Sequence, residues 1–195
     1  RGLGAAYTLM LIDGKRVNAT SAMFRGNDYD TGWVPADEIE RIEIVRGPMS
    51  SLYGSDAIGG VVNIITRPVG KQWRGSARVE GVVQENREAG DSRLAGFSLA
   101  GPVLTDTLGL KLSGAYDQRD ADGAINSAAA NGTRQTGLQH IRNQLFGAQL
   151  SFTPDTRQSL VADVDTSRRD HAGYLMERDA FSLRHKGRWG FGNTE

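Results

Sequence analysis

The feature that most constrains the fold is a series of period-two segments after residue 70, in which apolar and polar side chains alternate. Successive side chains of a strand point to opposite faces, so each segment predicts a strand with one apolar and one polar face. The apolar positions of the six segments are Trp73, Ala77, Val79 and Val83; Ala95, Phe97 and Leu99; Leu108, Leu110, Leu112 and Tyr116; Phe146, Ala148, Leu150 and Phe152; Leu160, Ala162 and Val164; and Phe181, Leu183, Trp189 and Phe191. Each segment is about as long as a tilted membrane strand, which needs about 9–11 residues. We therefore expect six antiparallel strands joined as hairpins.

The connectors between these segments differ in length. The short ones span 102–107 and 154–158, and the long polar ones span 119–141 and 168–178. Alternating short and long connectors are typical of outer-membrane barrels, although the connector at 86–92 is shorter than this scheme requires. Aromatic residues fall at the predicted short-turn strand ends, where a membrane-interface girdle would lie: Trp73, Phe152, Trp189 and Phe191.

Composition excludes some classes of protein and leaves others open. The chain has no apolar run approaching the roughly 18 residues of a membrane-spanning helix, and its mean hydropathy is -0.42. Its 23 Lys and Arg balance 23 Asp and Glu, so no global field would attract nucleic acid. It has no cysteine. A soluble β-sandwich with one wet face remains an alternative, because any antiparallel sheet can alternate in this way.

Residues 1–68 have a different pattern, typical of a small α/β unit. An apolar run at 7–12 ends in the turn Asp13-Gly14, a short helix begins at Pro35, and strands are expected at 42–45 and 61–65. We therefore place a domain boundary at residue 68. Since the chain begins without Met and stops inside a strand-like segment, both ends are interpreted as truncations.

Three runs in this first part carry a specific resemblance. They are residues 9–18 (LMLIDGKRVN), 39–48 (IERIEIVRGP) and 52–66 (LYGSDAIGGVVNIIT). They resemble the plug motifs of TonB-dependent receptors, and Arg1-Gly2 resembles the end of another such motif. The resemblance implies that 1–68 is the later part of an α/β plug domain. It also implies that 69–195 holds the first six antiparallel strands of a transmembrane β-barrel of about 22 strands in the outer membrane of a Gram-negative bacterium.

The segments 24–30 (FRGNDYD) and 33–35 (WVP) are similar to the catecholate siderophore subgroup, which includes the colicin I receptor. This likeness implies uptake of a ferric catecholate siderophore, energised by TonB through a segment that precedes the plug and is absent from this chain. Outer-membrane lipid and a colicin are further expected partners. Heme, cobalamin, sugars and other siderophores use the same architecture and stay open as ligands.

A ferric tris-catecholate is an anion with aromatic faces, so its site should offer cations and aromatic rings. The candidates are Phe24, Arg25 and Tyr29 in the plug, with Arg119, Arg168, Arg169 and His171 in the outer loops. The resemblance also implies that Arg1 and Arg46 pair with barrel-wall glutamates outside this chain. No metal-ligating residue and no cofactor are expected, because the siderophore already fills the coordination sphere of the iron.

Rival functions find little support in the sequence. The three histidines, His140, His171 and His185, lack zinc-type spacing, and there is no nucleophile elbow or phosphate loop. Asp163 and Asp165, predicted on one strand face, hint at a cation site but are equally explained as solvated carboxylates. An enzyme is therefore not expected. The plug motifs argue against an autotransporter or a passive porin.

Overall fold

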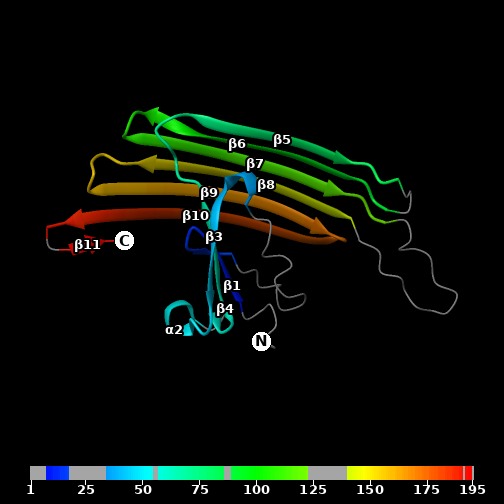
Figure 1. The fold of residues 1–195 in the computed structure, drawn as a ribbon, viewed down its shortest axis with the longest axis horizontal. Helices are drawn as coiled ribbons and strands as arrows, with labels where there is room; N and C mark the ends of the chain where they lie inside the picture. The colour runs from blue at the N-terminus through cyan, green and yellow to red at the C-terminus, as the bar shows by residue number, and fades with distance from the viewer. Residues whose placement is uncertain are drawn as a thin grey trace. The chain divides into compact units, whose positions relative to one another are not determined.

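The computed structural model describes residues 8–17, 34–54, 57–85, 89–122, 140–190 and 192–194. The chain divides into two compact units, which comprise residues 1–68 (unit 1) and 69–195 (unit 2). Each unit has its own sheet (Figure 1). None of the helices in the described part of the chain is long and apolar enough to cross a membrane.

Unit 1 is built on a four-stranded sheet in the order β2-β1-β4-β3. The strands are β1 (Thr8–Ile12), β2 (Lys15–Arg16), β3 (Ile39–Arg46) and β4 (Gly60–Thr66), and the helices are η3 (Ala36–Glu38) and α2 (Ser50–Tyr53). β4 pairs in parallel with β1 and antiparallel with β3. A small core of Leu9, Leu11, Ala57 and Val61 packs against Met49 and Tyr53. The helix predicted at Pro35 is a single 3₁₀ turn.

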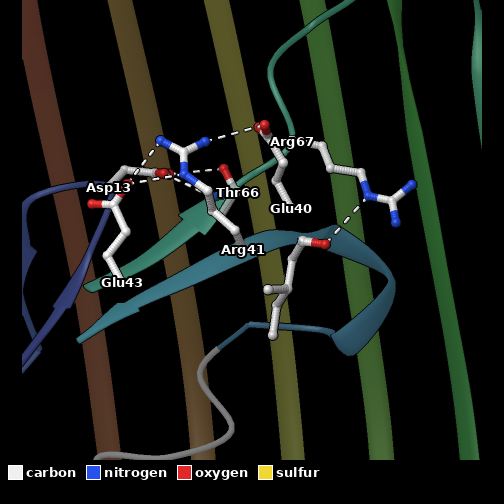
Figure 2. Close-up of polar contacts among 7 residues, drawn as sticks. Asp13, Glu40, Arg41, Glu43, Thr66 and Arg67 are labelled. Atoms are coloured by element: carbon white, nitrogen blue, oxygen red, sulfur yellow. Dashed lines mark hydrogen bonds and ion pairs between the residues drawn. The ribbon is translucent and has the colours of Figure 1, made fainter. Parts of the chain in front are cut away.

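The turn after β1 is attached to the end of β4. Asp13 and Gly14 have φ values of 49° and 79°, a conformation that Asp and Gly tolerate better than most residues. The Asp13 carboxylate accepts hydrogen bonds from Thr66 N at 2.9 Å and Thr66 Oγ1 at 2.8 Å (Figure 2). Gly14 N donates to Asn63 Oδ1 at 3.1 Å. The Asp-Gly turn seen in the sequence therefore also joins the end of β1 to β4.

Unit 2 is a seven-stranded antiparallel meander, in which each strand pairs with its neighbours in the chain (Figure 1). Its strands are β5 (Arg74–Val82), β6 (Ser92–Leu104), β7 (Leu108–Arg119), β8 (Ile141–Phe152), β9 (Gln158–His171), β10 (Tyr174–Trp189) and β11 (Gly192–Thr194). The predicted arrangement of an α/β unit followed by antiparallel hairpins is confirmed. About six strands were predicted and the sheet has seven, because the last segment divides into β10 and the three-residue β11.

The long polar loop predicted at 168–178 is wrong. β9 continues to His171, β10 begins at Tyr174, and Ala172 and Gly173 alone form the turn, with φ values of 59° and 83°. Positive φ at both central residues gives a tight turn whose twist matches that of the flanking strands. The charged residues of this segment were interpreted as a loop, whereas they continue the period-two alternation of a hairpin.

The register of unit 2 confirms the predicted division into an apolar and a polar face. One row across the sheet, for example, aligns Leu99, Leu112, Ala148, Val164 and Phe181. The apolar face is the exposed one: Phe181 is 71% exposed and Val164 47%. Asp163 and Arg169, on the polar face, are only 5% and 4% exposed. A sheet of the soluble β-sandwich alternative would bury its apolar face, so this burial pattern is the reverse of what that alternative requires.

Aromatic residues mark one end of the sheet, as the sequence predicted. Trp73 directly precedes β5, Phe152 ends β8 and Trp189 ends β10, all at the end where the connectors 105–107 and 153–157 lie. We call this the short-turn end and the opposite one the loop end. The three side chains are 50%, 41% and 44% exposed. Phe191, the fourth predicted member, lies outside the described residues.

The attachment of Asp13 to β4 leads to a testable prediction. Thr66→Val removes the hydroxyl donor and keeps the side-chain shape, which should cost about 1 kcal/mol of local stability. Amide hydrogen exchange of residues 60–66 in the purified protein should then become about fivefold faster. Thr66→Ser keeps the donor and should exchange like the parent; equal exchange rates in the two variants would contradict this role of the hydroxyl.

Candidate functional site

The predicted ligand residues and the predicted plug–barrel contacts, Arg1 and Arg46, divide between described and undescribed parts of the chain. Phe24, Arg25 and Tyr29, and also Arg1, lie outside the described residues. Arg46 is the exposed last residue of β3. The remaining four candidates all lie at the loop end of the unit 2 sheet: Arg119, Arg168, Arg169 and His171.

The register separates these four residues by face. Arg119 and His171 share one row with Ile141, and Arg169 is on the same face, in the row of Asn143. Arg168 points to the apolar face, where its Nε lies 3.4 Å from Glu177 Oε1 across the hairpin. Arg169 and His171 therefore lie on the polar face, where Arg169 is only 4% exposed, whereas Arg168 lies on the apolar face.

Asn143 connects three of the polar side chains at the loop end. Its Nδ2 donates to Asp117 Oδ2 at 3.1 Å, and its Oδ1 accepts from Arg169 Nε at 3.3 Å. His171 Nε2 lies 3.1 Å from the same Oδ1 and donates to it in the tautomer protonated there. Since a carboxylate only accepts and a guanidinium only donates, their chemistry fixes the orientation of the amide. The network holds Arg169 and His171 next to each other on the polar face.

Arg119 is already neutralised by neighbouring groups. Its guanidinium pairs with the Asp122 carboxylate and donates to the Asp120 carbonyl oxygen at 3.1 Å. The two side chains of the pair are 19% and 17% exposed. Arg119 therefore braces the end of β7, and an anionic ligand there would compete with Asp122.

Charge is distributed unevenly between the two faces of the sheet. In strands β5 to β10 the polar face carries nine cationic residues against four carboxylates. The cations are Arg74, Arg78, Lys111, Arg119, Arg169, Arg178, Arg184, Lys186 and Arg188, and the carboxylates are Glu80, Asp117, Asp163 and Asp165. The polar face is thus strongly positive although the whole chain is neutral, which favours anionic ligands on this face.

The apolar face has no such excess. Its three arginines are balanced by three carboxylates, all within the rows nearest the loop end. They are Arg93, Arg142, Arg168, Asp170, Glu177 and Asp179. From Phe181 to the short-turn end, this face of the strands carries no Lys, Arg, Asp or Glu. Such an uncharged band suits contact with lipid.

Unit 1 contains a second polar cluster that the sequence did not predict. Arg41 lies between Glu40 and Glu43, with N–O distances of 3.1 and 2.9 Å (Figure 2). The hydrogen bond to Glu43 is the main cause that raises the pKa of Arg41 above its ordinary value. Nearby, Arg67 Nε donates to the Ile39 carbonyl oxygen at 3.3 Å. The Arg67 contact braces the start of β3 against the end of β4, and the two ion pairs within β3 leave Arg41 little capacity for a ligand.

The described residues offer little to a metal ion. Within them, no group of three or more His, Asp or Glu side chains is placed to hold one. Asp163 and Asp165 do lie on one face, as predicted. Asp163 accepts a hydrogen bond from Ser182 across the hairpin.

Comparison with known proteins identifies the first unit. Residues 1–61 match the TonB-dependent Receptor Plug Domain family. The chain is 43% identical over 176 residues to the iron-regulated outer membrane virulence protein of Vibrio cholerae, covering 88% of this chain and 25% of that protein. It is 33% identical over 229 residues to the ferric enterobactin receptor of Pseudomonas aeruginosa, covering 100% of this chain and 31% of the receptor.

The fold matches solved structures along almost the whole chain. The siderophore receptor PirA from Acinetobacter baumannii superimposes with a TM-score of 0.84 at 30% identity, over 99% of this chain and 31% of that one. The ferric enterobactin receptor mutant of Pseudomonas aeruginosa in complex with enterobactin gives a TM-score of 0.82 at 30% identity, with 99% and 32% covered. The chain therefore spans between a quarter and a third of the length of these relatives.

The Asn143 network can be tested by a pair of neighbouring variants. Asn143→Ala removes a partner of Asp117, Arg169 and His171 at once, so it should cost about 1–3 kcal/mol and lower the urea midpoint of the purified protein. Gln144→Ala, one residue on and exposed on the other face, should leave the midpoint nearly unchanged. If both variants shifted it equally, the network would have no specific role.

Proposed function

Because the chain belongs to the TonB-dependent receptors, we propose that the protein is an outer-membrane transporter that takes up ferric siderophores with energy supplied through TonB. The plug match and the similarity to siderophore receptors support this proposal. The observation that carries it is the sorting of charge in unit 2, with a positive polar face and an uncharged apolar band. A wall of this kind can face lipid on one side and an anionic ligand on the other.

The proposed ligand class is the ferric catecholate siderophore. Its iron complex is a trianion with aromatic rings, so guanidinium groups can both neutralise it and stack on it. Arg169 and His171 are the best-placed described residues, because the Asn143 network holds them together on the polar face. Phe24, Arg25 and Tyr29 complete the proposed site, and Arg119 contributes if the ligand displaces Asp122.

The proposed transport cycle has three steps. A ferric siderophore binds at the loop end, TonB pulls on a segment N-terminal to the plug, and the plug rearranges to open a path. Arg1 and Arg46 are proposed to hold the plug through ion pairs with barrel glutamates. The protein acts by binding and gating and catalyses no reaction. A colicin that enters through the same receptor remains a proposed further partner.

The ligand class can be tested by tryptophan fluorescence quenching of the complete protein in detergent. A ferric linear catecholate should quench tightly, whereas a ferric hydroxamate and heme should bind at least about tenfold more weakly, because neither offers the same charged aromatic surface. Quenching by heme or hydroxamate instead would leave the proposed transport function intact and would assign it a different ligand. No quenching by any of the three would refute siderophore binding.

Two arginine variants refine the same measurement. Arg25→Ala should raise the Kd of the ferric catecholate by about tenfold, as expected for loss of a charged contact. Arg168→Ala, an equal truncation on the apolar face, should leave the Kd unchanged. An unchanged Kd in Arg25→Ala would remove that residue from the site.

The membrane-facing role of the apolar face gives a separate prediction. Val164→Arg puts a charge into the uncharged band and should cost about 2–4 kcal/mol in a bilayer, so less folded protein should be recovered from outer membranes. Gln149→Arg, on the polar face of the neighbouring strand, should be recovered at parental yield. Equal recovery of both variants would contradict the assignment of the faces.

A further inference from the structure

A cavity of about 540 Å³ lies at the short-turn end of unit 2, far along the strands from the Asn143 network. It is formed by the connector between β8 and β9 together with the ends of β10 and β11. Its lining residues are Thr153, Asp155, Thr156, Arg157, Gln158, Ser159, Lys186, Gly187, Arg188 and Thr194. Three of these side chains are cationic and one is a carboxylate.

Lys186 and Arg188 lie on the polar face of β10, and Arg157 lies in the connector directly before β9. Arg188 N donates to the Arg157 carbonyl oxygen at 2.9 Å, one step beyond the paired Gly187 and Gln158, so the two arginines lie opposite each other. Lys186 is two residues from Arg188 on the same face. Like charges directly opposite one another in a sheet are destabilising. This arrangement therefore has an unfavourable energy that a bound anion would relieve.

The described residues place no carboxylate in an ion pair with the two arginines. Asp155, the carboxylate among the lining residues, accepts hydrogen bonds from Arg157 N at 2.6 Å and Gln158 N at 2.8 Å. These bonds hold the turn before β9. The cavity keeps two guanidinium groups that can donate to an oxyanion in a forked geometry.

The face on which the cations lie indicates which anion is the occupant. Trp189 points to the apolar face, where its Nε1 donates to Thr194 Oγ1 at 3.2 Å. A lipid headgroup would approach from that face, whereas Lys186 and Arg188 belong to the polar face, which carries cations both near the loop end and near the short-turn end. An anion that binds at the loop end would meet the same type of surface here.

We propose that this cavity is a second binding site for the transported anion, which receives the ferric catecholate after it has left the loop end. Arg157 and Arg188 would contact its catecholate oxygens and stack on its rings, and the hydroxyls of Thr153 and Ser159 would supply further donors. The inference rests on the proposed function, and it adds a site at the short-turn end of the unit 2 sheet.

The test uses the complete protein in detergent with iron-55-labelled ferric enterobactin as the probe, in equilibrium dialysis at low salt. The parent should bind two equivalents, one tight and one at least about tenfold weaker and salt-sensitive. Arg157→Gln with Arg188→Gln should bind only the tight equivalent. In cells, this double variant should lower the maximal uptake rate by about threefold or more and leave the half-saturating concentration unchanged.

Two further double variants make the outcome specific. Arg157→Lys with Arg188→Lys keeps the charge and should retain most of the weak equivalent. Arg93→Gln with Arg142→Gln removes the same charge from the exposed apolar side of the loop end and should retain both equivalents. Loss of the weak equivalent in this control as well would mean a general charge effect and would overturn the proposal.

The remaining outcomes are equally decisive. Two equivalents and parental uptake in the Arg157→Gln, Arg188→Gln protein would overturn the second site and leave the proposed function intact. If the double variant also had a lower urea midpoint than the parent, Arg157 and Arg188 of the parent would instead pair with carboxylates of the protein itself. A parent that binds no ferric enterobactin, and no other ferric catecholate, would refute the proposed ligand before the second site is in question.

Discussion

The hydrogen-bonded register of the seven-stranded sheet determines to which face each side chain of the described strands of unit 2 points. Because directly paired residues share a face, one row fixes the orientation of all the others. A slip of one residue in a single hairpin would turn Phe181 and Leu183 to the polar face and move Arg184 to the apolar one. The division into a positive face and an uncharged band therefore depends on the pairing of the backbones, and side-chain contacts such as the Asn143 network act within that division.

Unit 1 depends on a different balance of forces. Among its described residues one buried cluster has four members, Leu9, Leu11, Ala57 and Val61, and β3 leaves Ile42 52% and Ile44 62% exposed. A cluster of this size contributes limited hydrophobic stabilisation. Polar contacts at one end of the sheet, among them Asp13 with Thr66 and Arg67 with Ile39, consequently carry a larger share than in a well-packed domain. This explains why the turn after β1 has side-chain partners on β4.

Local patterns in the sequence predicted the faces and the motifs, and they failed where distant residues or unusual backbone angles decide the structure. The turn at Ala172-Gly173 requires an alanine at positive φ, which its residue type disfavours. Asn143 was not predicted because its partners lie 26 and 28 positions away. Period two alone would have separated Arg168 from Arg169, since adjacent strand residues point to opposite faces. The Asp13 contacts with Thr66 likewise join residues 53 positions apart.

A net charge of zero conceals the electrostatic property that matters for an anionic ligand. If lipid covers the uncharged face, the low dielectric of that layer focuses the field of the arginines toward the polar side. Along β9 and β10 the field is not uniform, because Asp163 and Asp165 lie between Arg169 and Arg178 nearer the loop end and Arg184, Lys186 and Arg188 nearer the short-turn end. The proposed trianion would therefore find favourable charge nearer each end of these two strands and less favourable charge between them. Neutralising these two carboxylates would lengthen the positive surface and slow the release of the anion from it.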